Sequence, residues 1–381
     1  MLYGEDLEYI ENANISIKHN RFSSDPTNEE IDCEGLLMIP GLINAHTHIG
    51  DSIGKDLSLD LSFDQSINPI FGIKKKILEN SNKDHLIAFM RNAILSMLRR
   101  GITTFADFRE GGLEGIEMLR SVNIFNMHII ALGRINYYFD MDQIKNDQDL
   151  PEDVKEDAKK IIEYADGLGI SGANEYSNKA LAFFNSIRDD KIIAIHAAES
   201  RESYQRSIDN LGISDVKRII KYLKPDILVH MTNASKEDLK LVSNSNIVIC
   251  PRANAVLGVG IPDVKSMLDN NCNIAIGTDN VMLNSPDLFR EMDYLFKTSR
   301  VLGYPISAKE ILKMVTVNAA KMFRLESGYI ADNRIADAVF IDKYSIDLEP
   351  MHDPYASIVH RVDVNSIKAV MINGEIVYGE L

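Results

Sequence analysis

Four histidines and two carboxylates of this 381-residue chain stand at or just after the ends of short apolar runs. They are His46 and His48 in LLMIPGLINAHTH (36–48), His196 and Glu199 in KIIAIHAAES (191–200), His230 in DILVHMTNAS (226–235) and Asp279 in NIAIGTDN (273–280). Residues i and i+2 of an extended segment point to the same side, so His46 and His48 face the same way. Together with His196 and Asp279 they are the ligand types that bind a divalent ion of the zinc or iron type. One coordination position would stay open for water, as in a catalytic site.

Each histidine taken alone is more simply explained as a satisfied core residue. Their joint occurrence at strand ends, together with a carboxylate, favours a metal centre instead. A structural zinc site is an alternative, although such sites are usually rich in cysteine and closed to water. The residues therefore predict a catalytic metal site.

The elements that must position these residues alternate regularly along the chain. Eight short β-rich apolar runs are separated by amphipathic helical patterns; the runs cover 36–48, 102–108, 126–134, 167–174, 191–200, 226–235, 246–254 and 273–280. Eight strands alternating with helices predict a parallel sheet closed into a (β/α)₈ TIM-type barrel, whose open face lies at the C-terminal strand ends. The fourth run gives the weakest strand signal because its glycines lower β-propensity. Helices are predicted over 85–101, 216–223, 286–300 and 307–323.

The two ends of the chain have a different sequence pattern from the middle. Residues 1–40 and 326–381 carry short alternating segments, and Asn373-Gly374 predicts a hairpin turn between two strands. Neither end is long enough to form a stable sheet alone. The sequence therefore predicts an α/β protein in which both termini form one small β-sandwich-like domain, with the barrel (41–325) inserted between them.

Composition narrows the classes of partner. The 41 basic and 56 acidic side chains give a net charge of −15, which argues against nucleic acid and anionic membranes as partners. No apolar run is long enough to span a bilayer, and the acidic N-terminal segment does not resemble a signal peptide. Three scattered cysteines indicate neither a disulfide framework nor a metal knuckle. These features predict a cytoplasmic protein acting on a small molecule, and they leave its oligomeric state, including a homo-oligomer, open.

Several segments together carry a family resemblance that covers essentially the whole chain. PGLINAHTHIG, IHAAE, VHM, GTDN and INGEIVYG resemble the amidohydrolase superfamily, in its deaminase and chlorohydrolase branch, with the cytosine, guanine and S-adenosylhomocysteine/methylthioadenosine deaminases. The resemblance implies a site for one divalent ion, zinc or alternatively iron. The implied ligands are His46, His48, His196 and Asp279.

The resemblance also assigns roles in catalysis. Glu199 matches a proton-shuttling glutamate, and His230 would contact the hydrolytic water or the substrate. Branches with two metals carry a carboxylated lysine on the fourth strand, but GLGISGAN holds no lysine and Lys179 lies beyond it. A second metal is therefore not expected.

These assignments predict a hydrolytic deaminase of a nucleobase, nucleoside or related heterocycle. Asp279 would accept the proton of the metal-bound water, and the resulting hydroxide would attack an amidine-like carbon. Glu199 would protonate the ring nitrogen and assist ammonia release as general acid. Glu199 as a mere orienter of His196 is the weaker alternative. Hydrolysis of a cyclic amide or a C–Cl bond (imidazolonepropionase-like or chlorohydrolase-like) uses the same ligands and stays open. A non-catalytic metal-binding homologue ranks low because the catalytic groups are all present.

The identity of the substrate is less clear from the sequence. Arg109, Arg134 and Arg252 stand near strand ends and would bind an anionic substrate if they face the mouth. The alternative is that they pair with acidic residues on neighbouring loops. The lysine run Lys74–Lys76 is expected to be a solvated helix face.

Overall fold

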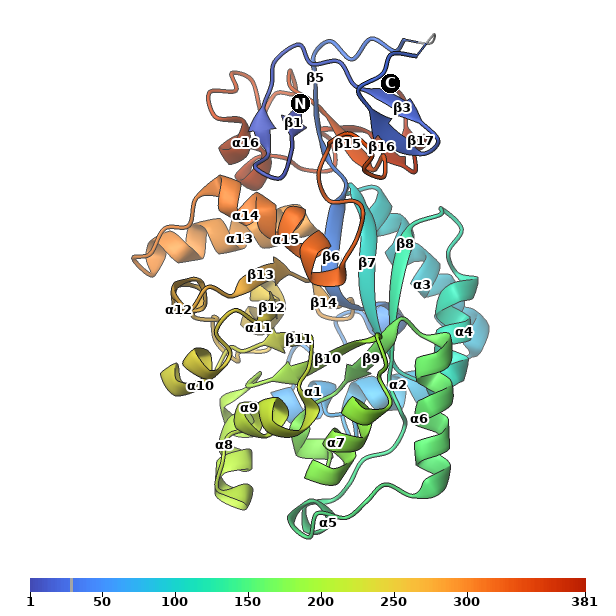
Figure 1. Cartoon of the computed structure of the whole chain (residues 1–381), viewed down its shortest axis with the longest axis vertical. Coiled ribbons are helices and arrows are strands. Elements are labelled where there is room, and N and C mark those ends of the chain that lie inside the picture. The colour runs from blue at the N-terminus through green and yellow to red at the C-terminus, as the bar shows by residue number, and fades with distance from the viewer. Residues whose placement is uncertain (28–29) are drawn as a thin grey trace.

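A computed structural model describes residues 1–27 and 30–381; residues 28–29, within the predicted terminal domain, lie outside the described residues. A curled sheet of nine parallel strands occupies its centre, in the order β13-β12-β11-β10-β9-β8-β7-β6-β14 (Figure 1). The strands are β6 (Leu42–His48), β7 (Ile102–Arg109), β8 (His128–Gly133), β9 (Gly167–Ile170), β10 (Ile192–Ala197), β11 (Ile227–His230), β12 (Asn246–Ile249), β13 (Asn273–Ile276) and β14 (Asp279–Asn280). β14 follows β13 after two residues and pairs with β6, so one segment links both ends of the sheet. This arrangement is consistent with the predicted TIM-type barrel.

Helices alternate with these strands along the chain. Between β6 and β9 they are η1 (Ile49–Gly54), α1 (Phe63–Ile67), α2 (Ile73–Asn80), α3 (Lys83–Leu98), α4 (Gly112–Ser121), α5 (Met141–Lys145) and α6 (Glu152–Tyr164). Between β9 and β12 they are η2 (Ala173–Glu175), α7 (Asn178–Ser186), α8 (Arg201–Leu211), α9 (Asp215–Arg218), η3 (Ile219–Leu223) and α10 (Lys236–Leu241). The remaining barrel helices are α11 (Pro251–Val256), α12 (Val264–Asp269), α13 (Leu288–Val301), α14 (Ala308–Met314) and α15 (Val317–Phe323). The helix predicted over 307–323 is divided because Thr316 has non-helical dihedrals (φ −137°, ψ −99°).

The glycines that weaken the fourth strand signal have a packing reason. β9 is present as predicted, and a Cβ at Gly169 would lie 2.8 Å from the ring of Phe108. A Cβ at Gly167 would collide with the backbone oxygen of Ile192 on β10. Only glycine allows the neighbouring groups to approach this closely.

Both chain ends contribute to a second, antiparallel sheet with the order β17-β16-β15-β5, which lies at one end of the molecule (Figure 1). Its strands are β5 (Leu36–Pro40), β15 (Ala338–Asp342), β16 (Ile367–Ile372) and β17 (Glu375–Gly379). Two short pairs and one helix accompany it: β1 (Leu2–Tyr3) with β2 (Glu8–Tyr9), β3 (Ser16–Lys18) with β4 (Arg21–Ser23), and α16 (Pro354–His360). The predicted hairpin turn is confirmed, with positive φ angles at Asn373 (53°) and Gly374 (81°).

The single strand predicted over 36–48 is in fact two strands that belong to different sheets. The break is at Gly41, where β5 ends its run in the terminal sheet and β6 begins the barrel. A Cβ at Gly41 would collide with the side chain of Thr103 and lie 3.0 Å from Cβ of Asp337. Among the described residues, no helix has the length and apolar character needed to cross a membrane.

Candidate metal centre

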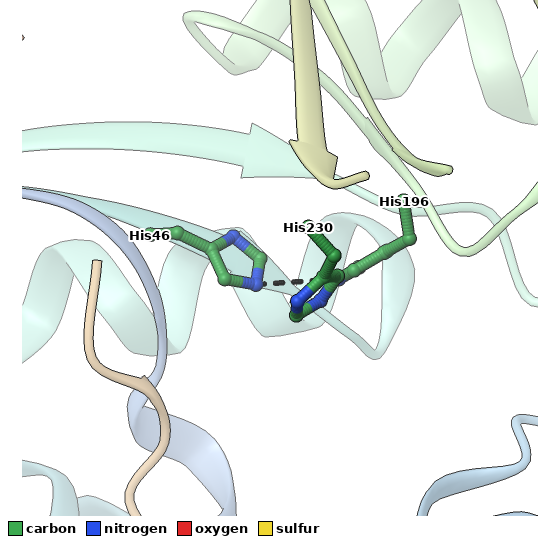
Figure 2. A group of neighbouring side chains, drawn as sticks. All are labelled: His46, His196 and His230. Atoms are coloured by element: carbon green, nitrogen blue, oxygen red, sulfur yellow. Dashed lines mark hydrogen bonds between the residues drawn. The ribbon is translucent and has the colours of Figure 1, made fainter. Parts of the chain in front are cut away.

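Three imidazoles and one carboxylate converge at the C-terminal ends of the barrel strands. Nε2 of His196, on β10, lies 3.2 Å from Nε2 of His46 and 3.4 Å from Nε2 of His48, both on β6. Oδ1 of Asp279, at the start of β14, lies 3.3 Å from Nε2 of His46 and 3.6 Å from Nε2 of His48. Figure 2 shows the rings of His46 and His196 meeting, with the ring of His230 beside them. The four predicted ligand side chains are therefore buried together, from strands far apart in sequence.

The hydrogen bonds at Nδ1 of His48 and His196 show which tautomer each ring adopts and therefore what its Nε2 can bind. Nδ1 of His48 lies 3.1 Å from the carbonyl oxygen of Phe108, and Nδ1 of His196 lies 3.0 Å from that of Ile170. A carbonyl oxygen only accepts, so Nδ1 carries the hydrogen and Nε2 presents a lone pair in each ring. Two such lone pairs face each other across 3.4 Å. A divalent cation shared by the two nitrogens removes this repulsion, and the donor set therefore fits a metal ion.

The buried surroundings determine the protonation state of the three imidazoles and the carboxylate. Burial lowers the pKa of His46 to about 4 and that of His48 to about 3, and it holds the pKa of His196 well below its ordinary value. Burial would raise the pKa of Asp279, but its hydrogen bond with His46 and the surrounding imidazoles outweigh that effect and lower it. Neutral imidazoles and an ionised carboxylate are the forms in which these side chains bind a metal.

A second group of polar atoms lies against the first. Oε1 of Glu199, Nε2 of His230 and Oδ2 of Asp279 are buried and have no hydrogen-bond partner among the described residues. The first two atoms are 3.5 Å apart, and Asn254 Oδ1 holds Nδ1 of His230 at 3.0 Å. Burial raises the pKa of Glu199 to about 7. Buried polar atoms are almost always paired, so three orphans in one place indicate a site built to meet a ligand.

The backbone is strained at the same place. His230 (φ 74°) and Asp279 (φ 59°) have left-handed conformations that non-glycine residues rarely adopt. Such conformations cost of order 1–3 kcal/mol each and persist where the surroundings enforce them, often at active sites.

The three predicted arginines are placed differently. Arg134 lines the pocket, its Nε donates to the carbonyl oxygen of Gly169, and its buried Nη2 has no partner among the described residues. Arg109 does not line the pocket, because its guanidinium lies against Asp107 (3.7 Å) and Glu110 (3.1 Å).

Arg252 is also outside the pocket lining. Its Nη1 is 3.6 Å from Glu291, and its Nη2 donates to Asn284 at 3.2 Å. The structure thus matches the alternative of acidic partners for Arg109 and Arg252. Arg134 also has an acidic neighbour, because its Nη1 lies 3.6 Å from Oε1 of Glu110, but of the three arginines it alone lines the pocket.

Sequence reasoning missed several polar residues near the site. The prediction that Lys74 belongs to a solvated face is wrong, because its side chain is 7% exposed and lines the pocket. Glu110 and Glu175 were not singled out, although Glu110 directly follows β7 and could have been found as another strand-end carboxylate. Lys179 is exposed on α7, and β9 contains no lysine, as expected.

Comparison with known proteins identifies the family to which the chain belongs. The model described as "Amidohydrolase family" matches residues 37–377. An uncharacterized protein of Methanocaldococcus jannaschii is 36% identical over 347 residues, covering 87% of this chain and 85% of that protein. A 5-methylthioadenosine/S-adenosylhomocysteine deaminase of Pyrococcus horikoshii is 27% identical over 95% of this chain and 87% of its own length.

A solved structure shows the same fold. Atrazine chlorohydrolase from Arthrobacter aurescens TC1, complexed with zinc, superposes with a TM-score of 0.85 over 98% of this chain and 92% of that chain, at 18% identity. At this identity the similarity concerns the fold.

Proposed function

The chain belongs to the amidohydrolase family, and from this premise we propose that it is a metal-dependent hydrolase that deaminates a small heterocycle. The substrate would be a nucleobase, a nucleoside or a related compound. One observation carries the proposal: a set of metal-ligand side chains lies directly against three buried polar atoms that lack partners. The similarity to a named nucleoside deaminase supports the reaction class.

His46, His48, His196 and Asp279 would hold one divalent ion, and zinc is supported by the zinc-bound structure of the same fold. Such an ion acts as a Lewis acid and lowers the pKa of water towards neutrality. The hydrogen bonds that Nδ1 of His48 and Nδ1 of His196 donate to backbone carbonyl oxygens keep these two rings in the orientation and tautomer that metal binding needs.

The unpartnered atoms have separate tasks in proton transfer. Oδ2 of Asp279 would accept the proton of the attacking water, while His230, held by Asn254, orients that water through Nε2. Oε1 of Glu199 would donate its proton to the ring nitrogen beside the reacting carbon and would be reprotonated by the proton that Asp279 took from the water. Glu199 would then protonate the amino group, which leaves as ammonia, and would regain a proton from the hydroxyl group of the addition intermediate as the carbonyl forms. The 3.5 Å between Oε1 of Glu199 and Nε2 of His230 supports a shared task for both groups at the same reacting atoms.

The pocket lining favours a substrate that carries a negative charge or a strong hydrogen-bond acceptor. The free Nη2 of Arg134 is a hydrogen-bond donor with no protein partner among the described residues. A buried guanidinium donor is best satisfied by a carboxylate, phosphate or carbonyl group of a ligand.

The remaining parts of the proposal concern organisation and location. The four-stranded sheet shared by both termini supports a separate β-sandwich-like domain made of residues 1–40 and 326–381, with the barrel over 41–325. Cys33, Cys250 and Cys272 are free in the structure, which supports a reducing, cytoplasmic environment.

The test combines metal analysis of the purified protein with an ammonia-release screen over nucleobases, nucleosides and pterins. Stoichiometric zinc and ammonia from one of these compounds are the expected result. Turnover of a cyclic amide or a chlorinated ring without ammonia would replace deamination by the alternative hydrolysis. A protein that binds metal but turns over nothing in either set would contradict the assignment of an enzyme.

A further inference from the structure

Lys74 is a buried cation at the edge of the candidate metal centre. It lies on α2, and its Nζ is 2.6 Å from Oε1 of Glu110 and 3.8 Å from Oδ2 of Asp51. The next residue, Lys75, is 34% exposed and pairs with Glu79 one helical turn away. Burying an ammonium group is costly unless it is paired, so the placement of Lys74 between two carboxylates is a specific feature of this site.

Glu110 connects this lysine to a candidate metal ligand. The same oxygen that contacts Lys74, Oε1, accepts a hydrogen bond from Nδ1 of His48 at 2.8 Å. Its other oxygen accepts from Nη2 of Arg109 at 3.1 Å. Lys74 and Arg109 therefore fix the carboxylate, and Nη1 of Arg134 lies 3.6 Å from the same Oε1. On the side opposite its free Nε2, the ring of His48 is held by this carboxylate at 2.8 Å and by the Phe108 carbonyl at 3.1 Å.

Asp51 connects the lysine to the other side of the site. Its Oδ2 accepts from the amide of Asn280 at 2.7 Å, and its Oδ1 accepts from the backbone N–H of Met282 at 3.0 Å. Asn280 directly follows Asp279 on β14. Lys74 is thus placed between a carboxylate that holds His48 and one that holds the segment carrying Asp279.

We propose that Lys74 and Glu110 are positioning residues that set the orientation of His48 and thereby the metal affinity of the site. This inference rests on the proposed function for the identity of the ligands. It assigns a task to the buried side of α2, where Lys74 lies. The competing explanation is an ion pair that stabilises the fold and leaves metal binding unchanged.

The experiment measures zinc affinity of the metal-free protein by competition with a chromophoric chelator. Glu110→Gln keeps the shape but removes the charge, and Lys74→Met removes the cation. We expect both to weaken zinc binding about 10- to 100-fold, the range typical for loss of a group that orients a metal-ligating histidine. Lys74→Arg should recover most of the affinity, while the matched neighbour variant Lys75→Met should bind zinc like the wild type.

The outcomes separate this inference from the proposed function. Wild-type zinc affinity in Glu110→Gln and Lys74→Met would overturn the inference while leaving the deaminase proposal intact. Absence of zinc binding by the wild-type protein would overturn both. Thermal unfolding of the metal-free proteins tests the competing explanation, because a structural pair would lower the Tm of the metal-free variants without changing affinity. Should Lys74→Met fail to fold, Glu110→Gln and Lys74→Arg decide, with the visible spectrum of the Co²⁺-loaded proteins reporting any change around His48.

Discussion

Two carboxylate–histidine pairs, one at the catalytic end of the barrel and one at its junction with the terminal sheet, behave in opposite ways. At the catalytic end Asp279 lies 3.3 Å from His46, and both side chains are at most 2% exposed. At the junction with the terminal sheet, Asp337 lies 3.1 Å from His128, whose side chain is 29% exposed. The pKa of His46 is lowered to about 4 by burial. Burial also lowers the pKa of His128, but the hydrogen bond and charge of Asp337 outweigh it and raise the pKa above 6.5.

The difference shows how the surroundings decide what a carboxylate–histidine pair does. His128 keeps access to water and has one acidic neighbour, so its charged form is stabilised and the pair joins β8 to the terminal sheet. Asp337 also accepts the backbone N–H of Asn373 in the hairpin turn. His46 has no access to water and faces other imidazoles, so it stays neutral. The first arrangement stabilises the fold, and the second is suited to binding a cation.

The largest effect should follow from removing a ligand at the catalytic end. His196→Asn is expected to abolish both stoichiometric metal binding and turnover, because only two imidazoles and one carboxylate remain. Metal analysis and the turnover assay measure this. The corresponding change at the other end, His128→Asn, should leave metal content unchanged. Equal metal loss in both variants would contradict the distinction between the two pairs.

Glu199→Gln tests the chemistry rather than the ligand set. Turnover should fall about 10²- to 10⁴-fold, the usual contribution of a general acid–base group, with metal content retained. Glu202→Gln, on the exposed side of α8, is the control and should have full activity. Undiminished turnover in Glu199→Gln would exclude the proposed proton transfer.

A third change acts on the connection between the two regions. Gly41→Ala places a methyl group against Thr103 and Asp337, and we expect it to lower the free energy of unfolding by about 1–3 kcal/mol. Denaturant unfolding measures the loss. Gly54→Ala is the comparison, because the nearest atom to its Cβ would be the flexible end of Ile77 at 2.9 Å, and Met282 Cβ would lie at an ordinary 3.9 Å. If Gly41→Ala lost no more unfolding free energy than Gly54→Ala, the predicted close packing at the junction would be contradicted.

The smallest expected effect is a pH dependence at the junction. The folded pKa of His128 exceeds its ordinary value of 6.5, so its stabilising contribution is complete below about pH 6.5 and disappears as pH rises through the folded pKa. His128→Asn should therefore lose up to about 1 kcal/mol of unfolding free energy at pH 6 and little at pH 9. Unfolding curves at both pH values measure this. The control is His85→Asn, at an exposed histidine, for which the change in unfolding free energy should be the same at both pH values. A loss that grows with pH would contradict the ion pair.

The approximate positions of the barrel strands and the residue types at their ends follow from the sequence alone, whereas the division of 36–48 into β5 and β6 does not. Alternating apolar runs and helical patterns predict the parallel sheet, and the HxH spacing, IHAAE and GTDN place His46, His48, His196 and Asp279 at its open edge. These features are local, because a strand and its terminal residue are adjacent in sequence. The hairpin turn at Asn373-Gly374 is local in the same sense, since its positive φ angles follow from the residue types.

Which charged side chains are buried, and which partners they have, follows from the fold. Lys74 belongs to a lysine run typical of a solvated helix, yet it contacts Glu110 and Asp51, which follow two different strands. Arg109, Arg134 and Arg252 look equivalent in the sequence, but only Arg134 faces the pocket with a free donor. Burial and charge pairing depend on atoms brought together from distant segments, and a desolvated group changes its protonation or its partner accordingly. For this reason the ligand types could be predicted from the sequence, whereas the contacts that orient them required the fold.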